Sequence, residues 1–103
     1  MRVFIDEQVF EKVNTFYYAA MQNHITLTKE TVDRKIWRME KGLQTLSRMQ
    51  GFRRAWLKHE WIEQEWHEFL CEGFVYAYEV CEDETTGEQF VWVRDVVHGS
   101  LYH

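Results

Sequence analysis

The residues best suited to chemistry lie in the last few positions of the sequence. Residues 98 to 103 read His-Gly-Ser-Leu-Tyr-His and contain two imidazoles, those of His98 and His103, and the phenol of Tyr102. Imidazole titrates near neutral pH and is the commonest proton-transfer group in proteins. The stretch directly follows a long apolar run, so we expect these groups to lie where a strand leaves its sheet.

A basic ridge on a predicted helix forms a second set of candidate residues. Thr28 is a suitable N-cap and Gly51 a suitable end for this helix. Its apolar positions recur at helical spacing and are Val32, Ile36, Met39, Leu43 and Leu46. The opposite side carries the basic residues Arg34, Arg38, Lys41 and Arg48. Such a ridge is usually only solvated, but it can also bind phosphates, as in RNA.

The sequence predicts neither a metal site nor a cofactor. The His and Cys residues show no short C-x-x-C or H-x-x-x-H spacing. Gly-rich phosphate loops and a G-x-S-x-G motif are also absent. Cys71 and Cys81 are expected to be reduced thiols, because no export signal is evident in the sequence.

The candidate residues near the end depend on a predicted hairpin for their position. Residues 74–81 and 90–97 are rich in Val, Tyr and Phe and read as two strands, and the polar stretch 82–88 between them reads as a turn. Both strands carry apolar residues on both alternating sets, which predicts a hairpin at the centre of a sheet. Residues 66–71 predict a third strand, joined to the hairpin by a turn at Glu72 and Gly73.

The first half of the chain reads as a strand and two helices. Residues 2–5 predict a short strand, and Asp6 caps a helix that ends near Asn23. Together with the helix after Thr28 it should form an antiparallel helical hairpin. Residues 52–66 fit either a helix or a strand. The expected fold is therefore α+β, with a β-α-α-β-β-β order and the helical hairpin packed on an antiparallel sheet, in a single domain of residues 1–103.

The charge distribution is strongly uneven along the chain. The net charge is −5, yet residues 29–58 hold nine Lys/Arg against three Asp/Glu, a local balance of +6. Residues 59–93 hold ten Asp/Glu and no Lys/Arg, a local balance of −10. This pattern favours one surface for an anion and another for a basic partner, or equally two solvated faces of opposite bias. No run approaches the ~20 apolar residues of a membrane helix, so we expect a cytoplasmic protein without membrane contact.

Two segments, read with the order of elements, resemble the RelE/ParE superfamily of toxins from bacterial type II toxin–antitoxin systems. Residues 73–80 (GFVYAYEV) are similar to the family's G-Y-R-h-h-Y-x-h strand, where h is apolar. Residues 90–102 (FVWVRDVVHGSLY) are similar to its closing pattern with a tail histidine and tyrosine. The chain departs from the family at Val75, and at Ser100 and Leu101, where the family has arginines.

The resemblance implies a toxin neutralised by a cognate antitoxin protein. RelE-type members are mRNA interferases that cut mRNA on the ribosome without a metal. By this resemblance His98 or Tyr102 would transfer a proton, and Arg94, Arg54 and Lys58 would neutralise the phosphorane. RNA binding would fall to Arg53 and to the basic ridge described above. A homodimer is compatible with this expectation.

Two other readings of the resemblance remain open at this point. ParE-type members share the fold, have no catalytic residue and inhibit DNA gyrase. A degenerate member would bind its antitoxin and little else, and the missing arginines favour this reading. Whether the chain is an enzyme, an endoribonuclease of the RelE kind, therefore stays undecided from the sequence.

Overall fold

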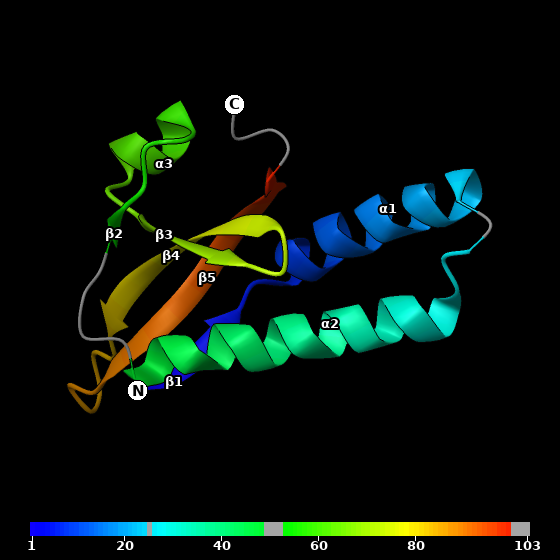
Figure 1. The fold of residues 1–103 in the computed structure, drawn as a ribbon. Coiled ribbons are helices and arrows are strands. Elements are labelled where there is room, and N and C mark those ends of the chain that lie inside the picture. The colour runs from blue at the N-terminus through cyan, green and yellow to red at the C-terminus, as the bar shows by residue number, and fades with distance from the viewer. Residues whose placement is uncertain (25, 49–52, 100–103) are drawn as a thin grey trace.

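The chain folds as an α+β domain in which helices cover one face of a sheet (Figure 1). The computed structural model describes residues 1–24, 26–48 and 53–99. In chain order the elements are β1 (Arg2–Ile5), α1 (Glu7–Asn23), α2 (Lys29–Gln44), the 3₁₀ helix η1 (Thr45–Arg48), β2 (Arg53–Arg54), α3 (His59–Glu63), β3 (His67–Cys71), β4 (Phe74–Glu82) and β5 (Gln89–His98).

The sheet has five strands in the order β1-β5-β4-β3-β2. The expectation of a purely antiparallel sheet is wrong, because β1 runs parallel to β5, with Arg2 opposite Phe90 and Ile5 opposite Val93. β3 and β5 each run antiparallel to β4, so they point in the same direction. β1 points in this direction as well. Parallel neighbours need a long crossover connection, which the chain between β1 and β5 supplies.

The predicted hairpin is confirmed as the centre of the sheet. β4 and β5 pair along their whole length, and each has another strand on its outer side. Gly87 has a φ of 73° in the connecting turn, and Glu72 and Gly73 have positive φ between β3 and β4. The ladder shifts once: Ala77 lies opposite Asp95 but Tyr78 lies opposite Val93. Arg94 is therefore the extra residue of a β-bulge, a device that re-aims neighbouring side chains.

The helix starts follow the predicted caps. The Asp6 carboxylate accepts a hydrogen bond from the Gln8 N–H at 3.1 Å, and the Thr28 hydroxyl accepts one from the Thr31 N–H at 3.2 Å. α1 ends at Asn23 as predicted, whereas α2 ends at Gln44 and continues only as η1. The predicted helix end at Gly51 lies outside the described residues.

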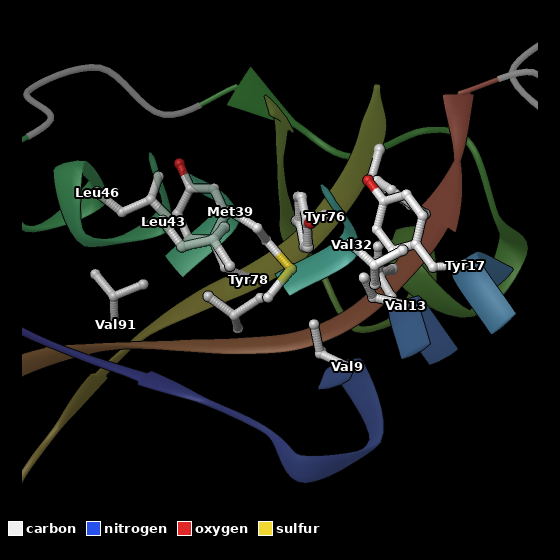
Figure 2. Packing of buried hydrophobic residues seen from close by; sticks show 13 residues of the cluster. Val9, Val13, Tyr17, Val32, Met39, Leu43, Leu46, Tyr76, Tyr78 and Val91 are labelled. Atoms are coloured by element: carbon white, nitrogen blue, oxygen red, sulfur yellow. The ribbon is translucent and has the colours of Figure 1, made fainter. Parts of the chain in front are cut away.

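α1 and α2 pack on what we call the closed face of the sheet. Side chains from both helices meet those of β4 and β5 in one apolar core (Figure 2). Its members include Val9, Val13, Met39, Leu43, Tyr76, Tyr78, Val91 and Val93. α2 also approaches β3 closely at Gly42, where an added Cβ would overlap the Cys71 Sγ. This core fixes the helices on the sheet.

The opposite side, which we call the open face, is only partly covered. A second core of Ala55, Trp61, Trp66, Val75 and Ala77 lies there. Residues 53–66, whose structure the sequence did not decide, form β2 and α3 and cover this end of the face. Both cysteines are free, as expected. Among the described residues, no helix is both long and apolar enough to span a membrane.

Candidate functional site

The buried carboxylate of Asp95, on the open face, contacts two lysines and a tryptophan. Asp95 is only 4% exposed. Its Oδ1 contacts the Lys12 Nζ at 2.5 Å and accepts the Val96 N–H at 2.8 Å. Its Oδ2 accepts the Trp61 Nε1–H at 2.8 Å and lies 3.3 Å from the Lys58 Nζ. We call Lys12, Lys58, Trp61 and Asp95 the Asp95 cluster.

The Asp95 cluster joins three parts of the chain, which are α1, the segment around α3, and β5. Lys12 reaches the carboxylate from α1, whereas Lys58 and Trp61 come from the segment that covers the open face. β1 ends opposite Val93, so β5 continues past it without that neighbour, and α1 packs beside β5 instead. The bulge at Arg94 places Asp95 on the open face, opposite Ala77 and beneath Trp61.

The Asp95 carboxylate stays ionised at neutral pH. Burial on its own would raise the pKa of Asp95, but hydrogen bonds from Lys12, Trp61 and the Val96 N–H outweigh it and lower that pKa below its ordinary value. The two lysine side chains are 45% and 39% exposed. Two ammonium groups held by one carboxylate leave a net positive charge that an anion can reach.

Arg94 lies beside the cluster in an aromatic stack. Its guanidinium carbon is 3.9 Å from the centre of the Trp92 ring and 5.6 Å from that of Trp66. Its Nε is 3.6 Å from the Glu79 Oε2. A guanidinium over an aromatic ring keeps its charge and its orientation. Arg94 is thus a fixed cation, already balanced by one carboxylate.

A row of residues that includes two carboxylates crosses the open face through Ala77. Arg53, Glu68, Ala77 and Asp95 lie opposite one another on four successive strands. The Arg53 Nε is 2.8 Å from the Glu68 Oε1, and Glu68 is 7% exposed. The two buried carboxylates therefore flank Ala77, and each is paired with at least one basic group.

The structure brings together only part of the predicted catalytic set. Arg94 and Lys58 both lie on the open face. His98 lies on the closed face, where its ring stacks 4.2 Å from Phe16 and meets Phe74 edge-on at 5.2 Å. Arg54 lies opposite His67, which belongs to the closed-face side of β3. Tyr102 lies outside the described residues.

The predicted RNA-binding residues do not form one surface. Arg34, Arg38, Lys41 and Arg48 are all exposed on α2 and η1, facing away from the sheet. Lys41 lies over the Trp37 ring, 5.4 Å from its centre. Because α2 covers the closed face, this ridge and the Lys58–Arg94 region are on opposite sides of the molecule. Arg53 is on the open face and is paired with Glu68.

Sequence reasoning missed Lys12, Trp61 and Asp95 as partners in a site. One signal was available: Arg94 and Asp95 interrupt an otherwise apolar strand. Lys12 could not be found in this way, because it lies 83 positions from its partner and on a helix read as purely structural.

We also looked for metal-binding groups among the described residues and for similar known proteins. No group of three or more His, Cys, Asp or Glu residues within residues 1–24, 26–48 and 53–99 could hold a metal ion. No family model, curated protein or solved structure matches this chain.

Proposed function

We propose that this chain is the toxin of a bacterial type II toxin–antitoxin pair of the RelE/ParE kind, acting in the cytoplasm by cleaving ribosome-bound mRNA. The observation that supports it is the placement of Lys12, Lys58 and Arg94 on one face of a sheet whose other face carries two helices. Three cations on one surface can bind a phosphodiester and stabilise its transition state, which carries more negative charge. A cognate antitoxin would cover this face.

The cations would bind the scissile phosphate and its neighbours. Lys12 and Lys58 are positioned by Asp95 and point partly to solvent, so an RNA phosphate could bind them without breaking the buried hydrogen bonds of Trp61 and Val96. The RNA 2′-hydroxyl would attack the adjacent phosphorus, forming a new P–O bond while the 5′-oxygen leaves. By resemblance, the proton transfers would fall to Tyr102, because the His98 imidazole is packed on the closed face, away from these cations.

A binding mode of action, such as inhibition of DNA gyrase, is the second candidate. Two observations favour it: Lys12, Lys58, Arg53 and Arg94 each contact a carboxylate, and the His98 imidazole is packed between Phe16 and Phe74. Cations that are each paired with a carboxylate and an imidazole stacked between two phenyl rings would also suit protein recognition. A member that binds only its antitoxin fits the same geometry.

The test is induction of the chain in bacteria, with growth, transcript ends and plasmid supercoiling followed in parallel. We expect growth arrest and new transcript ends, both lost in Lys58→Ala/Arg94→Ala. The matched control is Arg34→Ala/Arg38→Ala, which removes two positive charges from the α2 ridge. Circular dichroism of each purified variant checks that it is folded.

The outcomes separate the candidates. Arrest with intact transcripts and reduced supercoiling would support the gyrase reading and exclude cleavage. Cleavage that survives the Lys58/Arg94 variant but not the ridge variant would move the RNA site to α2. No growth effect with any variant would remove the toxin proposal and leave the antitoxin-binding reading.

A further inference from the structure

The open face also carries an apolar groove that no residue of the Asp95 cluster lines. It is an open depression of about 1080 Å³ between β1, the start of β5 and the β4–β5 turn. Phe4, Phe90 and Trp92 are its aromatic lining residues, with the rings of Phe4 and Phe90 edge-to-face at 5.4 Å. Phe4 is 48% exposed. Exposed aromatic rings gathered in a depression mark a binding surface more often than isolated apolar side chains do.

Carboxylates stand at both ends of this groove. Asp83 and Glu88 belong to the β4–β5 turn, which lies beside the start of β1 (Figure 1), and Asp6 and Glu7 follow the end of β1. Arg2 is the one Lys or Arg in the described lining. The groove therefore has an apolar centre, two carboxylates at one end, and two carboxylates beside Arg2 and Met1 at the other. This excess of carboxylates disfavours a phosphate backbone as its ligand.

The distance between the two ends sets the length of a matching segment. β1 has four residues, and a strand rises about 3.3 Å per residue, so the groove runs for about 13 Å. An extended peptide crosses that distance in about four residues. The Arg94 guanidinium lies 3.9 Å from the centre of the Trp92 ring and occupies it, so Phe4 and Phe90 are the rings that an apolar side chain could cover.

We propose that this groove binds an extended segment of a partner protein with an apolar or aromatic residue at its centre and Lys or Arg about two positions away on each side. The central side chain would cover Phe4 and Phe90, and the two basic groups would reach Glu7 at one end and Glu88 at the other. The inference does not depend on the toxin proposal, because the residues that would contact the segment, Phe4, Glu7, Glu88 and Phe90, are not among those proposed to bind RNA.

The test is an NMR titration of the labelled full chain with the peptide acetyl-Lys-Thr-Leu-Thr-Lys-amide. We expect shifts centred on the amides of β1 and on the Trp92 indole. The same peptide with Glu in place of both Lys should cause no such shifts. Glu7→Gln/Glu88→Gln should weaken binding about tenfold, and Phe4→Ser should weaken it by a similar factor. Added salt should weaken it as well.

A control with the same change in net charge is available on α2. Glu30 occupies the first turn of α2 as Glu7 does that of α1, and Glu40 is exposed further along. Glu30→Gln/Glu40→Gln should leave binding unchanged. Equal weakening by both pairs of substitutions, equal binding of the Glu peptide, or no shifts at about 1 mM peptide would overturn the proposal. So would a dimer in sedimentation that Phe4→Ser dissociates, because the groove would then bind a second copy.

Discussion

The two faces of the sheet are stabilised in different ways. The closed face is an apolar interface in which helix and strand side chains fill the space between layers, and one buried hydroxyl, that of Tyr76, has no hydrogen-bond partner among the described residues. The open face holds two buried carboxylates, each tied to basic groups. The closed face is therefore stabilised mainly by side-chain packing, and the open face also by buried ion pairs. Substitutions on the two faces should change the free energy of unfolding for different reasons.

The largest effect is expected on the open face, from Asp95→Ala. The change removes the acceptor of the buried Trp61 and Val96 N–H groups and leaves two ammonium groups facing each other. The free energy of unfolding should fall by about 3 kcal/mol, measured by urea denaturation. Asp33→Ala, at an exposed position of α2, should change it by less than about 0.5 kcal/mol. Similar losses from both would show that Asp95 has no special role.

On the closed face, Gly42→Ala should be costly although it improves helix propensity. Alanine within a helix normally stabilises it by about 1 kcal/mol relative to glycine. Here the new Cβ would overlap the Cys71 Sγ, so we expect a loss of about 2 kcal/mol. In a Cys71→Ala background the same substitution should cost less or become stabilising. An equal loss of unfolding free energy in both backgrounds would show that overlap with the Cys71 Sγ is not its cause.

A smaller effect concerns pH and His67, at the closed side of β3. Burial, and secondarily the charge of Arg54, lowers the pKa of His67. The unfolded chain, with a histidine pKa of about 6.5, therefore binds the proton first. The stability that the folded state has with a neutral His67 is therefore fully present above about pH 6.5, and it is lost as the pH falls through the folded pKa of His67.

The urea midpoint should accordingly fall between about pH 7.5 and pH 5, and fall less in His67→Gln. The lowered pKa of Asp95 acts separately, because its contribution is present above about pH 3.9 and is lost only as the pH falls through the folded pKa. A pH profile that is the same in His67→Gln and the parent would show that His67 is not coupled to folding.

The smallest effect is expected from Tyr76→Phe. Burial is the main reason that the pKa of this phenol is strongly raised, and its hydroxyl is buried without a hydrogen bond in the described part of the chain. Removing the oxygen should leave stability unchanged or raise it by up to about 1 kcal/mol. Tyr18→Phe, 67% exposed on α1, is the control for the chemical change alone. A clear loss from Tyr76→Phe would reveal a polar partner and weaken the contrast between the faces.

Local signals in the sequence were enough for most of the elements. Asp6 and Thr28 mark the helix starts because their side-chain oxygens cap the first turns, and the alternating apolar residues around Gly87 identify the central hairpin. The class α+β follows from these elements and their order. The detailed likeness to a RelE/ParE toxin stays a prediction.

Long-range pairing was beyond the reach of the same reasoning. The direction of β1 depends on how the whole chain crosses the sheet, which residues 2–5 do not encode locally. Lys12 and Asp95 meet only because a bulge re-aims the strand and α1 lies along its free edge. Trp61 was ambiguous because a five-residue helix leaves too short a pattern to recognise.

The pairing of β1 with β5 also constrains how the molecule can assemble. During synthesis, β1 and both long helices leave the ribosome before their partner strands exist, so their apolar sides have nothing to pack against until β4 and β5 follow. Closing so long a loop costs entropy before any contact repays it. The nascent chain should therefore depend on chaperones, and truncation within β5 should leave an aggregating product instead of a partly working domain.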